Sequence, residues 1–400
     1  MRPPPLALLQ WSNLLVGCGS FLTAMVSNGL WTSVGWSFWS IGLAMTIGSL
    51  CYAGCVIIGG RLADHWGRAR TALLGAAIGA LGCALAVAAP GPSVALVATM
   101  LAFAGPALFF PGCAGLFSDA EGASGAAPVP LHVKVSKYNL GWSAGNFCGF
   151  AGFALLAQAD VRIGFAVAGA AFLAVIALLW HWRSLPPRPP APAGDRAPHP
   201  ALPRLTMTAR VALLLCCMLS MGMISAISRA LAGTAGDDAR GWAGLTLACY
   251  SGGYVITFMV FGHWAGWVLR PWRMWTLQIA FLVGALGICA LALGAMVTPT
   301  LLAACGALIG VGFASCYTTS IYYSLRLPDG VGRAAGLHET FIGVGNTLGP
   351  LVSGLALSGW SMWAVGSDLL GLGCYLVAAA VICLGVQAVL IPAAVRLGAR

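Results

Sequence analysis

The sequence predicts an all-helical integral membrane protein with twelve transmembrane helices, arranged as two similar halves. Of its 400 residues, 60% are hydrophobic and only 8% are charged, whereas soluble globular domains carry about 25% charged residues. The 54 glycines allow close approach of membrane helices, and the 15 tryptophans suit anchoring at the membrane interface. This composition excludes a soluble fold, because too much apolar side chain would be exposed to water.

Twelve stretches of the chain approach the roughly 20 apolar residues that a helix needs to cross a bilayer. Charged segments or Pro and Gly residues separate them, as at 61–70, 90–92 and 270–273. In chain order, the expected spans are 8–28, 37–59, 71–90, 94–116, 139–158, 162–181, 210–231, 242–264, 274–296, 299–323, 336–358 and 367–391. More spans follow the first one, so we expect an uncleaved helix there rather than a signal peptide.

Residues 182–209 separate the sixth span from the seventh. This segment is rich in Pro, charged and low in complexity, so it cannot bury a core and is expected to be a flexible linker. The chain is therefore predicted to form an N-terminal six-helix bundle (1–181), a cytoplasmic linker (182–209) and a C-terminal six-helix bundle (210–400).

The basic residues predict the orientation of the chain. With the N-terminus placed inside, only Arg162, Arg229 and Arg240 of the 20 Lys and Arg residues fall outside. Cytoplasmic loops carry an excess of Lys and Arg over the loops on the other side, so both termini are expected in the cytoplasm. The high Ala, Gly and Pro content favours a bacterial source, and hence the inner membrane. Because topology accounts for the positive charge, we expect the lipid bilayer, and no nucleic acid, as a partner.

The 14 cysteines lie mostly inside apolar runs, without CxxC or Cys/His spacing. This pattern is typical of cysteine used as a small buried hydrophobic residue. We therefore expect no metal site and no cofactor.

The two halves resemble each other at an offset of 200 residues. The matched pairs are Gly145 with Gly345, Asn146 with Asn346, and Gly149 with Gly349. Duplicated halves are a recurrent design of secondary transporters, in which the substrate site lies at the interface between the halves.

The segment from Gly60 to Arg70 reads GRLADHWGRAR. It resembles the signature between helices two and three of the major facilitator superfamily, GxLaDrxGr followed by a basic residue. The resemblance implies two six-helix bundles around a central cavity, with rocker-switch alternating access. It also implies that Asp64 and Arg68, with Gly60 and Gly67, take part in a cytoplasmic gate.

The second half carries a degenerate copy of this segment, GHWAGWVLR from Gly262. Gly266 stands where Asp64 stands in the first half, while Arg270 keeps the basic position. The gate would then depend mainly on the first half. The alternative is that Arg68 and its basic neighbours only enforce the topology.

Glu339 is the clearest ionisable residue inside a predicted span, and His338 precedes it. Ionisable groups within the membrane are costly and mark functional sites, and a carboxyl group removed from water holds a proton more readily. These two residues are therefore the candidates for proton coupling. The alternative is that Glu339 caps its helix or pairs with Arg333.

Other polar and aromatic side chains are candidates for lining a substrate cavity. In span five, Asn139, Trp142 and Asn146 share one helix face at i, i+3 and i+7. The other candidates, from the second half, are Tyr250, Tyr254, Tyr317 and Asn346. For each residue, the alternative is a hydrogen bond that only joins two helices.

These observations together predict a monomeric secondary transporter of a small solute, for which proton coupling through Glu339 is one hypothesis. The scarcity of buried charge favours a neutral, amphipathic or aromatic substrate. One alternative is a sensor or scaffold with a transporter-like fold. Another is an intramembrane enzyme that uses Glu339 with His338, or Ser143 in a GxSxG match. An enzyme would need polar catalytic residues clustered at one depth, so we expect no catalytic site.

Overall fold

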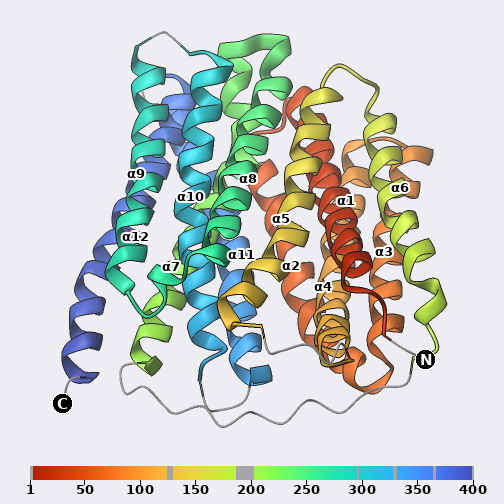
Figure 1. The fold of residues 1–400 in the computed structure, drawn as a ribbon. Helices are drawn as coiled ribbons and strands as arrows, with labels where there is room; N and C mark the ends of the chain where they lie inside the picture. Colours follow the sequence, from red (N-terminus) through yellow and green to blue (C-terminus); the bar gives the residue numbers. More distant parts are fainter. Residues whose placement is uncertain are drawn as a thin grey trace.

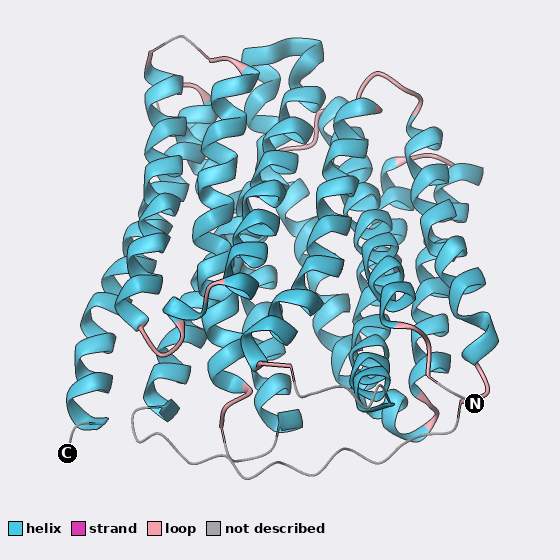
Figure 2. Ribbon diagram, in the orientation of Figure 1, coloured by secondary structure: helices cyan, strands magenta, loops and turns pink. Residues whose placement is uncertain are grey.

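The computed structural model describes residues 3–123, 129–185, 202–294, 297–327, 331–363 and 366–398. Helices make up nearly all of this part of the chain, and no strand occurs in it (Figure 2). The α-helices are α1 (Leu6–Ser33), α2 (Phe38–His65), α3 (Arg68–Ala88), α4 (Pro92–Ala123), α5 (Leu131–Leu155), α6 (Val161–Leu179), α7 (Leu202–Ala235), α8 (Ala239–His263), α9 (Pro271–Leu293), α10 (Pro299–Ser324), α11 (Val331–Trp363) and α12 (Asp368–Gly398).

The first six helices and the last six form two bundles that lie side by side (Figure 1). Both ends of the chain lie at the same end of the molecule, here called the termini end. Helix α7 begins at Leu202, eight residues before the expected start of span seven. The last part of the expected linker is therefore helical, and its residues 186–201 lie outside the described part of the chain.

Local chemistry explains several of the helix starts. The side chains of Ser37, Asp160 and Thr298 accept hydrogen bonds from free backbone N–H groups in the first turns of α2, α6 and α10. Pro271 and Pro299 begin α9 and α10. At this position the missing N–H of proline costs no helical hydrogen bond.

Glycines on α5 and α11 confirm the offset of 200 in the packing of the two halves. A Cβ on Gly145 would collide with the carbonyl oxygen of Leu14 in α1, and a Cβ on Gly345 would collide with that of Leu214 in α7. Gly149 and Gly349 lie in the same way against Cys18 and Met218, again 200 residues apart. Both helix pairs therefore approach closely enough that only glycine fits.

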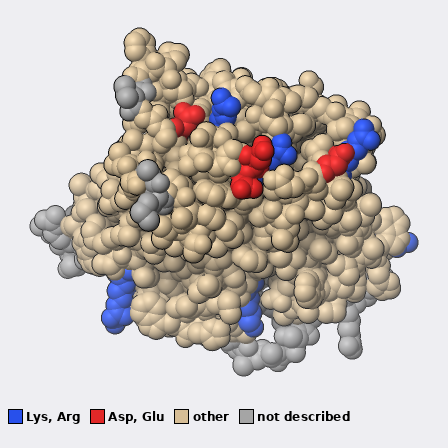
Figure 3. All heavy atoms as spheres, turned by 90° about the horizontal axis from the view of Figure 1, so that it is seen from above, with Lys and Arg blue, Asp and Glu red and all other residues tan. Residues whose placement is uncertain are grey.

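Ten stretches of the described chain are long and apolar enough to cross a membrane. One of them contains both α7 and α8, and α5 is not among them, since polar residues such as Asn139 and Asn146 lower its mean hydropathy along its length. Large apolar side chains such as Ile57, Leu155 and Val389 face outward. Viewed onto the end away from the termini, the surface carries few charged groups (Figure 3). These features are those of an integral membrane protein, with twelve helices compatible with twelve crossings.

Candidate functional site

A cavity of about 140 Å³ lies between the two bundles, near the middle of the helices. Its described walls come from α1, α2, α4 and α5 of the first half and from α7, α8, α10 and α11 of the second. These helices occupy equivalent places in the two halves, so the cavity lies on the axis that relates them. A site built from both halves is the arrangement that duplicated transporters use.

One wall of the cavity is aromatic. The ring of Trp142 on α5 lies 5.7 Å from that of Tyr254 and 5.1 Å from that of Tyr317, measured between centroids. Tyr250 and Phe313 extend the cluster, with centroids 5.1 and 5.5 Å from that of Tyr254. Trp142 thus joins the first bundle to rings of the second. Such a wall offers flat π faces to a bound molecule.

The polar side of the cavity centres on Glu339. It carries the only carboxylate among the described lining residues, and no Lys, Arg or His accompanies it in that set. The hydroxyl of Tyr52 on α2 donates to Glu339 Oε2 on α11 at 3.5 Å. This contact spans the two bundles, so a change in the charge of Glu339 acts directly on their interface.

His338 does not share the cavity with Glu339. Consecutive residues on a helix point about 100° apart, and His338 is fully buried behind the cavity wall. Its Nδ1 lies 3.0 Å from the hydroxyl of Ser320, and its ring meets that of Tyr317 edge-on at 5.1 Å. The predicted pair of Glu339 and His338 is therefore not a contiguous proton path in this structure.

Six of the seven residues predicted to line a cavity do so: Trp142, Asn146, Tyr250, Tyr254, Tyr317 and Asn346. Asn139 is the exception. It is buried one turn away, where its Oδ1 accepts a hydrogen bond from Trp142 Nε1 at 3.3 Å. Asn139 thus orients the indole instead of facing the cavity.

Sequence reasoning missed Tyr52 and several apolar residues of the lining, and it left Tyr138 out of the candidate set. Five of the eight tyrosines line the cavity: Tyr52, Tyr138, Tyr250, Tyr254 and Tyr317. The sequence could have indicated all five tyrosines, because a tyrosine hydroxyl deep in a span needs a hydrogen-bond partner or water. Residues such as Ile342 and Phe103 gave no comparable signal, since they resemble any core residue.

Away from the termini end, the two bundles are joined by direct contacts. Asn28 Nδ2 on α1 donates to the backbone carbonyls of Ile224 and Ser225 on α7, at 3.2 and 2.8 Å. Gly42 on α2 lies so close to α11 that a Cβ would collide with the carbonyl oxygen of Pro350. These contacts hold the two bundles together on that side of the cavity.

At the termini end, Arg68 forms an ion pair with Asp119. The distance between Arg68 Nη1 and Asp119 Oδ1 is 2.6 Å, and Nη1 also donates to the carbonyl oxygen of Gly115 at 3.0 Å. The pair joins the first turn of α3 to the last turns of α4, within the first bundle. Asp119 was not a predicted site residue, because it falls in the segment expected to be a loop.

The other predicted gate residues lie around this pair or in its equivalent in the second half. Gly67 caps α3 with φ +114°, a conformation that suits only glycine. Gly60 has open space around its Cα, and Arg270 caps α9 at the surface. Asp64 is exposed and has no ion-pair partner within the described chain.

Ser143, the serine of the GxSxG match, lies in the middle of helix α5. Its hydroxyl donates to the carbonyl oxygen of Leu140 at 3.3 Å, one turn back. A nucleophile elbow needs a sharp strand–turn–helix, and a continuous helix does not provide it.

Comparisons with known proteins agree with this geometry. Residues 11–350 match the family described as the Major Facilitator Superfamily. No curated protein matches the sequence.

Solved structures show the same fold. A peptide transporter POT in complex with sulfate has a TM-score of 0.71 at 14% identity, covering 99% of this chain and 95% of that one. The nucleoside transporter NupG has a TM-score of 0.67 at 14% identity, covering 97% and 98%. A bacterial homolog to the human lysosomal transporter Spinster, inward-facing and occupied, has a TM-score of 0.64 at 16% identity, covering 98% and 96%.

Proposed function

Because this chain belongs to the major facilitator superfamily, we propose that it is a secondary transporter whose bundles rock around the central cavity. The family and fold predicted from residues 60–70 and from the two halves are confirmed. The protein is an integral membrane transporter of a small molecule. Its substrate, mechanism and coupling ion belong to the proposal.

The substrate class that fits the cavity is a flat aromatic molecule, either neutral or carrying one positive charge. The residues that line the cavity support this proposal. Trp142, Tyr254 and Tyr317 offer π faces, and Glu339 offers one carboxylate. No basic group is present among the described lining residues. A cation over aromatic faces gains about 0.5 to 2 kcal/mol. An anion would meet Glu339 with no counter-charge.

A thermal-shift screen of purified protein against aromatic cations, neutral aromatics, sugars and organic anions tests this class. We expect stabilisation by members of the first two groups and flux of the same compounds in proteoliposomes. Stabilisation only by anions or sugars would contradict the substrate class. The absence of flux for every compound that binds would favour a sensor over a transporter.

Proton coupling through Glu339 is the second part of the proposal. Its carboxyl group faces the cavity, and its hydrogen bond with Tyr52 spans the interface between the bundles. Protonation removes the negative charge from this interface, and a cationic substrate would compete with the proton for the same carboxylate. The carboxyl group of Glu339 would therefore link binding of the substrate, binding of the proton and movement of the bundles.

The variant Glu339→Gln tests this coupling because it keeps the shape of the side chain but cannot exchange a proton. We expect loss of transport driven by a pH gradient, while binding of a neutral substrate and its exchange across the membrane persist. Asp160→Asn, an exposed helix-capping acid at the far end, is the control and should keep the gradient response. Gradient-driven transport by Glu339→Gln at the wild-type rate would disprove the proposal.

We further propose that Arg68, with Asp64, Gly60, Gly67 and Arg270, controls opening at the termini end. The partly buried pair of Arg68 with Asp119 supports this role. The termini would lie in the cytoplasm of a bacterium, since the sequence puts only Arg162, Arg229 and Arg240 of its Lys and Arg residues in segments expected on the opposite side. A reporter enzyme that is active only in the cytoplasm should be active when it is fused to the C-terminus. Activity of a periplasm-specific reporter at the same position would show that the orientation is the opposite one.

The gate is tested with Arg68→Ala and Asp119→Asn. An ion pair that keeps some contact with solvent contributes about 1 kcal/mol, which corresponds to about fivefold in an equilibrium constant. We expect a change of about that size in transport rate, with substrate affinity unchanged. The double variant should be no more affected than either single one.

The control for this test is Arg61→Ala, which removes an exposed basic residue in the same segment. If Arg61→Ala and Arg68→Ala reduce transport equally, the basic residues serve topology alone.

A further inference from the structure

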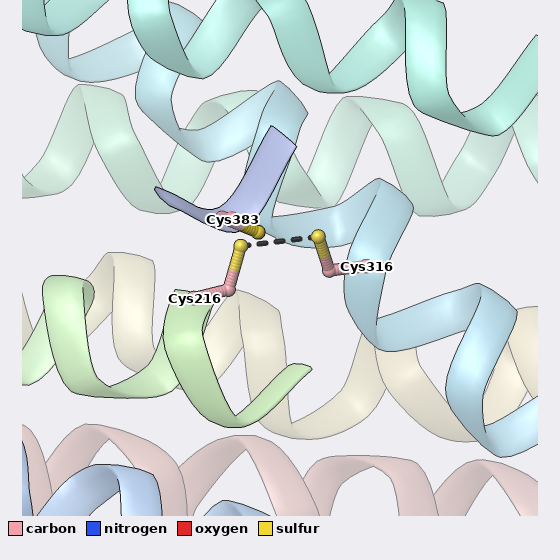
Figure 4. Close-up of side chains that lie close together, drawn as sticks. All are labelled: Cys216, Cys316 and Cys383. Atoms are coloured by element: carbon pink, nitrogen blue, oxygen red, sulfur yellow. Dashed lines mark hydrogen bonds between the residues drawn. The ribbon is translucent and has the colours of Figure 1, made fainter. Parts of the chain in front are cut away.

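Three cysteine thiols meet inside the second bundle, away from the cavity lining (Figure 4). Cys216 comes from α7, Cys316 from α10 and Cys383 from α12, and all three are buried. Their sulfur atoms lie within 4.8 Å of one another, and those of Cys216 and Cys316 are 3.1 Å apart. We propose that these thiols bind one soft, thiophilic metal or metalloid ion.

The spacing of the sulfurs suits three-coordinate binding. An ion held at about 2.3 Å from three sulfurs in a plane would place them about 4.0 Å apart. The separation of Cys216 and Cys316 is shorter than this value, at 3.1 Å, and no separation among the three sulfurs exceeds 4.8 Å. Small rotations of the side chains therefore bring all three sulfurs to a common centre.

A buried amide supports the ligand on α12. Gln387, one turn along the helix, shares an N–H group between two acceptors of Cys383: Nε2 lies 3.1 Å from the carbonyl oxygen and 3.5 Å from Sγ. Gln387 is in turn held by Gln278 Oε1 on α9 at 2.5 Å. An N–H group directed at sulfur stabilises the thiolate form, and such outer partners orient metal ligands.

The donor set selects the class of ion. Sulfur ligands without a carboxylate favour soft ions such as Cu(I) and disfavour Mg²⁺ and Ca²⁺. Each positive charge displaces one thiol proton, so Cu(I) leaves a neutral site with one thiolate and two thiol donors. Arsenous acid also gives a neutral site: three As–S bonds replace three As–O bonds, and three water molecules leave without any redox change.

The site lies directly behind the cavity wall. Cys217 and Tyr317, the next residues after Cys216 and Cys316, line the cavity. All three thiols belong to one bundle, so rocking of the bundles against each other would leave the site intact. A bound ion would tie α7 to α10 and α12 and would act on the cavity from outside the substrate path.

The test uses the reduced full-length protein in detergent. It is loaded anaerobically with Cu(I), arsenite or Zn(II) in separate samples and freed of unbound ion by gel filtration. We expect about one ion per chain for at least one of the three. X-ray absorption should show three sulfur neighbours around the bound ion. The ion that is retained shows which of Cu(I), arsenite and Zn(II) the site prefers.

Variants locate the ion. Cys216→Ala, Cys316→Ala and Cys383→Ala should each lower the affinity at least about tenfold, and the Ser variants provide a second set that keeps the side-chain shape. Cys113→Ala is the matched control, because Cys113 is equally buried but lies on α4 in the first bundle. The ion should also raise the unfolding temperature of the wild type and of Cys113→Ala only.

Two results would overturn the proposal. One is failure of the reduced wild type to retain any of the three ions. The other is equal retention by Cys113→Ala and by folded variants of the three clustered cysteines, which would place the ion on the remaining thiols.

Discussion

Trp142 brings an aromatic ring of the first bundle into contact with the aromatic wall of the second. Its ring meets Tyr254, Phe258 and Tyr317, and its indole N–H donates to Asn139. The hydrogen bond limits rotation of the indole, so the face that lines the cavity is held in place. A single side chain thus contributes both to the interface between the bundles and to the lining of the cavity.

Replacing Trp142 should weaken substrate binding. Trp142→Ala removes one aromatic face of the cavity, and a loss of about 0.5 to 2 kcal/mol corresponds to roughly two- to thirtyfold in Kd. Trp142→Phe should lose less, because a ring remains. Binding can be measured by calorimetry with a compound found in the thermal-shift screen.

Trp11→Ala is the control for this prediction, because Trp11 lies on the outside of α1 with 58% of its surface exposed. If both alanine variants bind the compound as the wild type does, Trp142 is an interface residue and not part of the substrate site.

At the level of helices, glycine determines how closely α5 approaches α1 and α11 approaches α7. Gly145→Ala and Gly345→Ala each place a Cβ against backbone of the neighbouring helix. Overpacking of this kind costs about 1 to 3 kcal/mol. We expect both variants to unfold at a lower temperature, and to a similar extent because the contacts are equivalent.

Gly54→Ala and Gly385→Ala are matched controls, since nothing lies within 4 Å of a Cβ built at either glycine. Both lie in helices, where alanine is favoured over glycine by up to about 1 kcal/mol. Their unfolding temperatures should stay level or rise. A loss of stability equal to that of Gly145→Ala would mean that close packing is not the cause.

Helix boundaries account for one difference between sequence and structure. Hydropathy predicts a span from residue 336, which would put Glu339 near a helix end. The structure begins α11 at Val331, so Glu339 lies in its third turn and faces the cavity. The first residues of α11 are too polar to be predicted as part of an apolar span. They are nevertheless helical, which hydropathy does not predict because it reports the polarity of side chains and not the conformation of the backbone.

For the whole molecule, the contact of Asn28 with α7 gives a test of alternating access. In the double variant Asn28→Cys, Ser225→Cys, the new thiols lie on facing turns of α1 and α7. Oxidation to a disulfide should stop transport in proteoliposomes, because the bundles could no longer separate on that side. A reductant should restore it.

Each single variant controls for the substitution itself and should transport after oxidation. Undiminished transport by the cross-linked double variant would contradict rocking of the bundles around the cavity.

The sequence by itself determined the membrane location, the helical fold, the two halves and the family. These properties follow from composition, from repetition at an offset of 200 and from one loop motif, all of which are local or periodic. It also indicated Trp142, Tyr250, Tyr254 and Tyr317 as cavity candidates, because polar aromatic groups are costly in lipid.

Only the tertiary structure decided which side chains meet. It separated His338 from Glu339, paired Arg68 with Asp119, and assembled Cys216, Cys316 and Cys383 from helices far apart in the chain. The sequence predicted no metal site, because the three cysteines show no ligand spacing. Convergence of side chains depends on the rotation and packing of each helix, and hydropathy carries no record of either.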